Sequence, residues 1–563
     1  MRSTDGTQVQ PGSSTADPAR SGGIALLVIS AATVLAYSNT FRASFHLDDL
    51  PLIVQNPALR DLRTLWPPSG SRWLGYVTFA LNYRMGGSAV FGYHLVNVLI
   101  HVCNGLLVYA LAAVTLRTPA LRRAELGPLV GRYLPLAAGL LFAVHPLATQ
   151  AVTYVIQRFA SLAALFYLLS LVLYAEARLS AEADRPAGAR VAGFATLSVL
   201  AAVAAMKTKE ISVTLPFVAA GYELLFLRPG RRLLPLLILA PLAATPLLVI
   251  VQPALRDVVA DAGISSAVYL LTQTRVVVRY LRLLVLPVGQ NFDYDFPLSK
   301  SLSEPAVLLS IALLLAVGAF AALLLVRALG TRRGAGLLGF FGIAWVFVTL
   351  SVESSFIPIK DVIFEHRMYL PSAGAAIALG TALLWGVERL RLRAALGLQC
   401  AAALSITCAP LAAATYRRNA VWQDELTLWS DVVAKSPGKA RAHHSLGVAH
   451  FARGELNEAV SEYLLALRIR PWYPEALTNL GNAYAALGRL DEAIRQYRRA
   501  VLVAPGLPEA HNNLGNTLAA QGLREEALRE YREALRLDPN LPEAKANLRR
   551  LEPLDPAMKR EQP

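Results

Sequence analysis

Residues 480–505 read LGNAYAALGRLDEAIRQYRRAVLVAP and decide the fold of the C-terminal part of the chain. The pattern recurs every 34 residues, because Leu446-Gly447, Leu480-Gly481 and Leu514-Gly515 are equally spaced. A period of this length is typical of arrays in which each repeat is one pair of helices. Five further positions recur in the same register, namely Gly454, Gly488 and Gly522; Ala459, Ala493 and Ala527; Tyr463, Tyr497 and Tyr531; Ala466, Ala500 and Ala534; and Pro471, Pro505 and Pro539.

The chemistry of these positions explains the repeat. Small residues let the two helices of a pair approach closely, the tyrosine fills the gap beside them, and proline ends the second helix. This pattern resembles the tetratricopeptide repeat (TPR), so we expect a TPR α-solenoid over 419–551. Its concave surface would hold an extended peptide or a partner helix, or the array serves only as a spacer. The expected repeats are 438–471, 472–505 and 506–539, with a partial leading repeat before them and a capping helix at 542–551.

The rest of the chain is too apolar for a soluble protein. Of the 563 residues, 55% are hydrophobic and 17% charged, and the mean hydropathy is +0.43. Because a helix needs about 20 apolar residues to cross a bilayer, we expect an all-α fold, with a polytopic helical bundle before the solenoid. The bundle should have about 11 spans, or 12 if 267–287 also crosses, at 23–40, 94–116, 133–151, 159–176, 190–206, 211–227, 233–251, 306–327, 335–352, 368–387 and 394–415.

The whole chain has a net charge of +15. In the apolar part before the repeats, the basic residues occur mainly in short arginine clusters between the spans. By the positive-inside rule such clusters mark the cytoplasmic side. The positive charge is therefore explained mostly by the membrane topology, and we do not expect nucleic acid as a partner. We expect a multi-pass protein of the inner (plasma) membrane, with a cytoplasmic N-terminus and a periplasmic TPR domain. The expected parts are a disordered tail at 1–22, a transmembrane domain at 23–418 with outer loops 41–93, 252–305 and 353–367, the TPR domain, and a tail at 552–563.

The segment 267–287 carries Arg275, Arg279 and Arg282 on one helical stripe. Such a stripe is typical of a helix lying in the membrane interface. We expect its valines and leucines, Val276 and Leu283 among them, to face lipid.

Two adjacent carboxylates, Asp48 and Asp49, follow the first span in the first outer loop. Neighbouring carboxylates repel each other, which raises the pKa of one and suits a general base. A solvated loop pair or a helix N-cap is the structural alternative.

Other polar residues fall on the same side of the membrane. His94, Asn97, His101 and Asn104 share one face of the second span, either as a structural hydrogen-bond seam or as the wall of a cavity. Basic groups nearby suit a lipid-linked phosphate, which Arg and Lys bind by charge-assisted hydrogen bonds. The remaining groups are His145 with Gln150 and Arg158; Lys209 with Glu210; and Glu353, Glu365, His366 and Arg367.

Taken in order, these motifs resemble the TMTC-type membrane proteins with TPR tails, glycosyltransferases of the GT-C class, in what looks like a bacterial version. The resemblance covers nearly the whole chain. Leu47 and Gln150 depart from the eukaryotic pattern, which has His and acidic residues in these regions. The matching motifs are Phe45 to Asp49 with Asn56-Pro57, Tyr93 to Asn97 with His101, Leu141 to Pro146, Lys209-Glu210, Leu286-Pro287 with Asp293 to Asp295, Glu365 to Ser372, and Trp422 to Leu426.

The resemblance implies transfer of a sugar from a polyprenyl-phosphate carrier to a protein hydroxyl, as in O-mannosylation, on the non-cytoplasmic side. Asp48 or Asp49 carries over as the catalytic base. Members of the class differ in metal use, so a divalent metal stays open, but no metal ligand is assigned and Cys103, Cys400 and Cys408 lack metal-ligand spacing. Arg367, Arg158 and Lys209 would hold the donor phosphate, with His94, His101, His145, Glu210, Glu365 and His366 as supporting polar groups.

Two other functions fit parts of the sequence. An O-antigen ligase or polymerase can also carry TPR repeats, but such enzymes use a large late outer loop, and the loop 353–367 is short. The non-enzyme alternative is a membrane-anchored scaffold that uses only its repeats, whereas the transferase would bind an acceptor protein or peptide through them.

Overall fold

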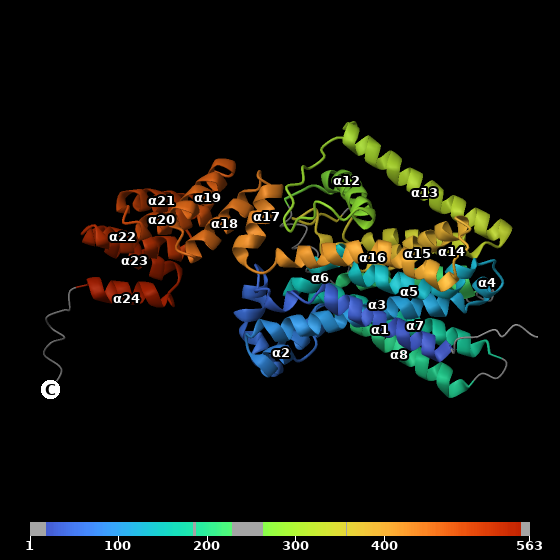
Figure 1. Ribbon diagram of the computed structural model, residues 1–563. Helices are drawn as coiled ribbons and strands as arrows, with labels where there is room; N and C mark the ends of the chain where they lie inside the picture. The colour runs from blue at the N-terminus through green and yellow to red at the C-terminus, as the bar shows by residue number, and fades with distance from the viewer. Residues whose placement is uncertain (1–17, 184–186, 228–262, 356, 553–563) are drawn as a thin grey trace, which may run out of the picture. The chain divides into compact units, whose positions relative to one another are not determined.

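The computed structural model describes residues 18–183, 187–227, 263–355 and 357–552 (Figure 1). Within these residues the chain is helical and no β-strand occurs, which confirms the all-α expectation. The expected span at 233–251, most of the tail at 1–22 and nearly all of the tail at 552–563 lie outside the described residues.

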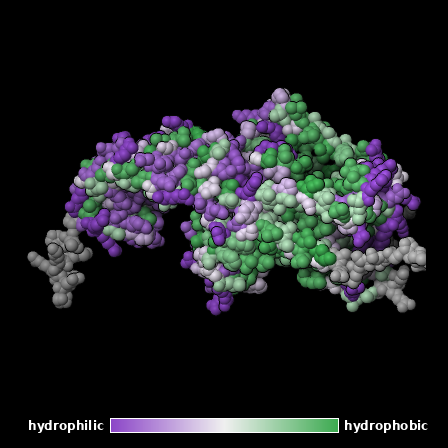
Figure 2. Space-filling view, viewed as in Figure 1, coloured by the Kyte–Doolittle hydropathy of each residue, from purple (hydrophilic) through white to green (hydrophobic). Residues whose placement is uncertain are grey.

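The chain divides into two compact units. The membrane unit comprises Met1–Val288 and Leu298–Ala420, and the repeat unit comprises Gly289–Pro297 and Val421–Pro563. Hydrophobic residues cover much of the visible face of the membrane unit, whereas hydrophilic residues predominate on the repeat unit (Figure 2). The two units therefore present surfaces suited to different solvents.

The helices of the membrane unit follow the expected apolar segments. Among the described residues, six are long and apolar enough to cross a membrane, and the bent pair Pro128–Val144 and Pro146–Thr153 would make a seventh span, so the expected count of about 11 is not confirmed. The α-helices of this unit are α1 Pro18–Ala36, α2 Trp73–Gly86, α3 Val90–Leu116, α4 Pro119–Arg122, α5 Pro128–Val144, α6 Thr149–Thr153, α7 Arg158–Ala181, α8 Gly188–Met206, α9 Leu215–Tyr222, α12 Ser266–Val285, α13 Pro305–Thr331, α14 Gly334–Leu350, α15 Pro371–Arg389 and α16 Leu396–Ala420.

Short 3-10 and π-helices fill the polar connections. They lie mainly in the first outer loop and at the ends of the broken helices. They are η1 Thr40–Arg42, η2 Leu50–Val54, η3 Pro57–Leu59, η4 Leu62–Leu65, η5 Pro146–Ala148, η6 Val155–Gln157, η7 Glu210–Thr214, η8 Glu223–Leu227 and η9 Glu365–Met368.

Small residues bring the membrane helices together. A Cβ atom added at Gly342 in α14 would collide with the main-chain oxygen of Gly374 in α15. One added at Gly139 in α5 would lie 3.1 Å from the main-chain oxygen of Gly105 in α3. Because lipid supplies little hydrophobic force between helices, such close backbone approach is a main source of their association.

Helix α12 differs from the expectation for the interface helix. Its apolar face does not point into lipid, because Val276 and Leu283 are fully buried in the protein. Tyr269 and Tyr280 of the same face donate hydrogen bonds to the carbonyls of Glu353 and Phe364. The expectation was wrong because this face of α12 packs against the loop 353–367 and donates hydrogen bonds to its main-chain carbonyls. Helical periodicity does not reveal a contact with so distant a segment.

The repeat unit consists of helix pairs whose packing follows the 34-residue pattern. A Cβ atom at Gly447, Gly481 or Gly515 would lie 2.6, 2.6 or 2.8 Å from the ring of the tyrosine sixteen residues later. The glycine is therefore required by the tyrosine that packs on it. The helices are α17 Glu425–Lys435, α18 Ala440–Ala452, α19 Leu456–Ile469, α20 Pro474–Ala486, α21 Leu490–Val503, α22 Pro508–Ala520, α23 Arg524–Leu537 and α24 Pro542–Leu551.

The inserted segment, residues 289–297, belongs to the repeat unit although it lies far from the repeats in sequence. Asp293 is 2% exposed and forms ion pairs with Lys439 at 2.6 Å and Arg441 at 2.7 Å. Phe292 packs edge-on against the buried rings of Trp422 and Trp429. Two cations and an aromatic contact thus hold this segment against the start of the array.

The glycine–tyrosine contact can be tested with Gly481→Ala. The added methyl group overlaps the Tyr497 ring, so we expect a loss of roughly 1–3 kcal/mol in the free energy of unfolding, as is usual for overpacking. Thermal unfolding of the purified protein measures this. Gly506→Ala is the matched control, because nothing lies within 4 Å of its added Cβ, and equal melting temperatures for the two variants would contradict the assignment.

Candidate functional site

The two carboxylates of the first outer loop have different surroundings. Asp49 is fully buried, and its side-chain oxygens accept hydrogen bonds from the backbone N–H groups of His46 at 2.9 Å and Ile156 at 2.7 Å. Asp48 is exposed, and its backbone N–H donates to the hydroxyl of Tyr154 at 3.2 Å. Asp49 therefore joins the loop to the segment before α7, and Asp48 presents the accessible carboxylate.

The environment of Asp49 also changes its acidity. Burial raises the pKa of Asp49 to about 7, although the N–H groups of His46 and Ile156 act in the opposite direction. At neutral pH a large fraction of the molecules therefore has Asp49 protonated, because burial disfavours the charged form of a carboxyl group.

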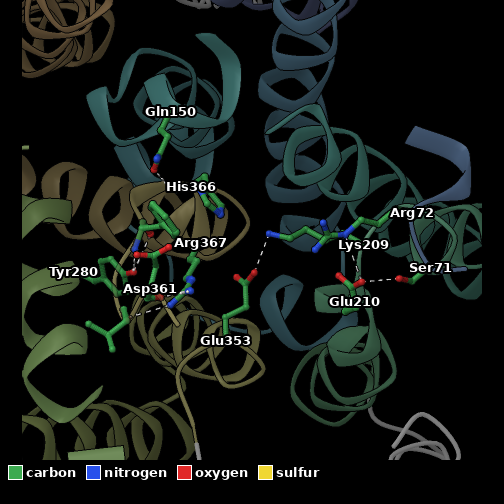
Figure 3. A network of polar contacts seen from close by, with 12 residues as sticks. Ser71, Arg72, Gln150, Lys209, Glu210, Tyr280, Glu353, Asp361, His366 and Arg367 are labelled. Carbon is green, nitrogen blue, oxygen red and sulfur yellow. Dashed lines mark hydrogen bonds and ion pairs between the residues drawn. The ribbon is translucent and has the colours of Figure 1, made fainter. Parts of the chain in front are cut away.

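A second cluster, the polar network of Figure 3, gathers cations from three segments. Lys209, just before η7, pairs with Glu353 at 2.8 Å. Arg367, in η9, is 3% exposed and donates to the carbonyls of Asp361 and Val362. Burial would raise the pKa of Glu353, but Lys209 and Arg367 outweigh it and hold that pKa below its usual value. Glu353 is therefore an anion between two cations.

Arg72 is the third cation of the network, and sequence reasoning did not select it. It precedes α2 and lies 3.6 Å from Glu210, which also accepts a hydrogen bond from Ser71. The Arg72 side chain is 49% exposed, unlike those of Lys209 and Arg367. No motif marks Arg72 in the sequence, because one arginine in a polar loop gives no periodic or spacing signal.

His366 lies among these charges in the neutral form. Burial holds the pKa of His366 well below its usual value, and Lys209, Arg367 and Arg72 lower it further. Its backbone N–H donates to Gln150 Oε1 at 2.8 Å. Within the described residues, Nδ1 of His366, Nε2 of Gln150 and Oε2 of Glu353 are buried atoms without a hydrogen-bond partner. Buried polar atoms left unpaired in one place indicate a site that a polar ligand completes.

The helix α6 connects the network to Asp48. Gln150 lies at its start, and Tyr154 follows its end four residues later, about one helical turn away. Gln150 contacts His366, and Tyr154 contacts Asp48. The exposed carboxylate and the cations therefore belong to one region of the membrane unit.

Arg158 is placed differently from Lys209 and Arg367. Its guanidinium is fully buried and donates to Asn97 and Asn82, both at 2.6 Å, and to the carbonyl of Tyr93 at 3.0 Å. It also lies over the Phe79 ring at 4.4 Å. With its donors engaged by neutral acceptors, Arg158 braces α2, α3 and α7 against one another, and this geometry does not favour the expected phosphate contact.

Three of the four histidines expected as supporting groups make structural bridges. His94 contacts the carbonyl of Ala43, and His145 contacts that of Leu284. His101 joins the carbonyl of Ala143 to the hydroxyl of Tyr369 at 2.7 Å. The contacts of His94 and His101, both on α3, form the structural hydrogen-bond seam that was one of the two alternatives for that helix face.

Glu365 and Glu210 complete the expected set. Glu365 is 1% exposed in η9 beside His366, and Glu210 pairs with Arg72 as described. Among the described residues, no group of three His, Cys, Asp or Glu side chains is arranged to hold a metal ion.

Comparisons with known proteins agree with this architecture. A family model described as "TPR repeat" matches residues 447–488 and 481–522, and a second one, described as "Tetratricopeptide repeat", matches residues 508–541. The chain is 26% identical to Protein O-mannosyl-transferase F38B6.6 of Caenorhabditis elegans, over 81% of this chain and 64% of the relative. It is 27% identical to the human Protein O-mannosyl-transferase TMTC4, over 78% and 65%.

A shorter match is closer in sequence. The mouse Protein O-mannosyl-transferase TMTC2 is 36% identical over 216 residues, which are 36% of this chain and 24% of the relative. The chain thus spans just under two thirds of the length of the first two relatives, and the relatives carry a name that describes sugar transfer to protein.

The burial of the Asp49 carboxyl group can be tested by pH. Since burial raises the pKa of Asp49 above its unfolded value, its contribution to stability is complete below about pH 4 and is lost as the pH rises through about 7. We expect the melting temperature of the wild type to exceed that of Asp49→Asn most at low pH, and this difference to narrow between about pH 4 and about pH 7. A gap independent of pH would show that Asp49 does not titrate in this range.

Proposed function

Because this chain belongs to the TMTC family of membrane proteins with TPR repeats, we propose that it is a membrane glycosyltransferase of the GT-C class. The donor is a sugar linked to polyprenyl phosphate, and the acceptor is a protein hydroxyl. The reaction takes place on the non-cytoplasmic side of the plasma membrane, where the outer loops and the TPR domain lie in the expected topology. The N-terminus is then cytoplasmic.

The observation that carries the proposal is that three cations from separate segments, Arg72, Lys209 and Arg367, meet in the polar network beside buried polar atoms of Gln150, Glu353 and His366 that have no hydrogen-bond partner among the described residues. The carboxylates Glu210, Glu353 and Asp361 lie with these cations, and His366 is neutral. A phosphodiester donor has one negative charge and its leaving phosphate has two. Fixed cations therefore stabilise the leaving group more than the bound donor, which is the requirement for catalysis.

The acceptor hydroxyl needs a base, and Asp48 fits this role better than Asp49. Both oxygens of Asp49 are held by backbone N–H groups, whereas Asp48 is exposed. In the proposed step the acceptor oxygen bonds to the anomeric carbon with inversion, its proton passes to Asp48, and the bond from that carbon to the phosphate oxygen breaks. The cations receive the charge, so no step is assigned to a metal.

The base is tested with Asp48→Asn in membranes supplied with a labelled polyprenyl-phosphate sugar. We expect transfer to fall by about 10²–10⁴-fold, the usual contribution of a general base, with the melting temperature unchanged. Asp49→Asn should instead lower the melting temperature. Wild-type turnover in Asp48→Asn would remove Asp48 from the mechanism, and absence of transfer by the wild type with every such donor would contradict the function itself.

The phosphate contact is tested with Arg72→Ala. A charge-assisted hydrogen bond is worth about 1.5–3 kcal/mol, so we expect the KM for the donor to rise by about 10–100-fold and that for the acceptor to stay constant. Arg84→Ala, an exposed arginine in the last turn of the same helix, is the control. Equal KM values for the two variants would exclude Arg72 from the donor site.

Deletion of the repeats separates an enzyme from a scaffold. The proposed transferase lacking 438–563 keeps turnover on a small soluble acceptor, whereas a scaffold has none in either form. Turnover in the shortened protein would therefore exclude a scaffold that only binds proteins.

A further inference from the structure

A cavity at the C-terminal end of α3 gathers four arginines. It has a volume of about 500 Å³, and its lining residues come from the ends of α3 and α7, from α4 and from the start of α8. The arginines are Arg117 after α3, Arg122 and Arg123 at the end of α4, and Arg190 in the first turn of α8. We call these four side chains, with Ser180 of α7, the arginine cavity.

The carboxylates near the arginine cavity are already engaged. Glu176 accepts two hydrogen bonds from Arg117, at 2.6 and 3.2 Å. Glu182, which also lines the cavity, lies 3.6 Å from Arg178. Arg178 in turn pairs with the buried Glu223 at 2.7 Å. The acidic residues of this region therefore neutralise Arg117 and Arg178.

The other three arginines of the cavity keep their charge uncompensated. In the part of the chain that the structure describes, the side chains of Arg122, Arg123 and Arg190 form no ion pair and no hydrogen bond. Like charges around one cavity repel each other, and an anion between them removes that repulsion. The positive-inside rule explains why arginines follow α3. It does not explain why arginines from two loops distant in sequence line the same cavity.

The position of the cavity favours a lipid headgroup as this anion. Arg190 lies in the first turn of α8, and Lys209 of the polar network follows the last residue of that helix, Met206. The 19 residues of α8 span about 29 Å, which is close to the thickness of the hydrocarbon core. In the same way, α2 and α4 lie at opposite ends of α3 (Figure 1). The cavity is therefore at headgroup level in the leaflet away from the polar network.

The rest of the lining suits the part of a lipid that adjoins its phosphate. Pro119, Leu179, Ala183 and Ala187 add apolar surface beside the arginines. Helix α8 faces outward over most of its length, since 17% of its apolar window is buried. A phosphomonoester has a charge of about −1.5 to −2 near neutral pH, so it matches three cations better than a phosphodiester with one charge.

We infer that the arginine cavity binds the phosphate group of an anionic lipid in the leaflet opposite to the polar network. Arg122, Arg123 and Arg190 donate charge-assisted hydrogen bonds to the phosphate oxygens, and the apolar lining contacts the glycerol part. Basic pockets between membrane helices hold anionic headgroups by this chemistry. The inference goes beyond the proposed function and is independent of it, because it needs neither a sugar nor a base.

The test is isothermal titration calorimetry of the full chain in a neutral detergent with three probes. Dihexanoyl phosphatidic acid is a short lipid with a phosphomonoester, dihexanoyl phosphatidylcholine is its zwitterionic counterpart, and inorganic phosphate has no lipid part. We expect phosphatidic acid to bind at least about tenfold more tightly than the other two, because only it combines the charge with the apolar contact. Equal affinity for inorganic phosphate would replace the lipid by a free phosphate, and equal affinity for both lipids would overturn the inference.

Variants locate the binding site. Each cation beside the phosphate contributes about fivefold in affinity, so Arg122→Gln with Arg190→Gln should weaken phosphatidic acid binding by about 20-fold or more. Arg327→Gln with Arg393→Gln is the matched control, because both arginines are exposed and neither lines the cavity. Equal losses in the two double variants would show a general attraction to positive charge and overturn the inference.

Two single variants complete the test. Arg190→Gln alone should weaken binding by about fivefold, which keeps the inference open to contradiction if the double variant does not fold. Binding that falls in Arg72→Ala and stays unchanged in Arg190→Gln would place the lipid in the polar network and overturn the inference. Absence of sugar transfer by the wild type would contradict the proposed function and leave lipid binding at the cavity intact.

Discussion

A polar group placed among membrane helices must find its partners inside the protein, because hydrocarbon offers none. The membrane unit depends on this constraint. Arg158 binds two asparagines and a carbonyl, and His101 joins Tyr369 to the carbonyl of Ala143. Asn104 donates to the same tyrosine. These contacts join α2, α3, α5, α7 and the residue that follows η9, and they hold in place the segments that carry the polar network.

The same constraint distinguishes polar residues that hold helices together from polar residues that keep atoms available for a ligand. The Arg158 guanidinium is held by Asn82, Asn97 and the carbonyl of Tyr93, whereas Gln150, Glu353 and His366 each keep one buried polar atom without a partner among the described residues. Asp48 and Asp49 divide in the same way, since only Asp49 accepts hydrogen bonds on both oxygens. An adjacent pair of like side chains thus has one structural member and one accessible member.

The repeats and the apolar spans could be predicted because each rests on local information. A 34-residue period and a run of apolar residues depend on positions that are counted along the chain. The sequence also selected Lys209, Glu210, His366 and Arg367, which the structure brings into one network. It did not select Arg72, and it assigned Arg158 to the donor phosphate. Whether an arginine side chain is buried or exposed depends on which helices surround it, and residue type alone does not predict this.

Helix α12 and the inserted segment show the same division. The sequence by itself determined that the chain is helical, that most of it is apolar enough for a membrane and that its end is a TPR array, because these follow from periodicity and composition. Only the tertiary structure decided that α12 buries its apolar face under the loop 353–367, that Asp293 pairs with Lys439 and Arg441, and that Asn513 of one repeat donates a hydrogen bond to Asn482 of the preceding one. The physical reason is that such contacts join residues distant in sequence, and their energy exists only once the backbone has brought the partners within hydrogen-bonding distance.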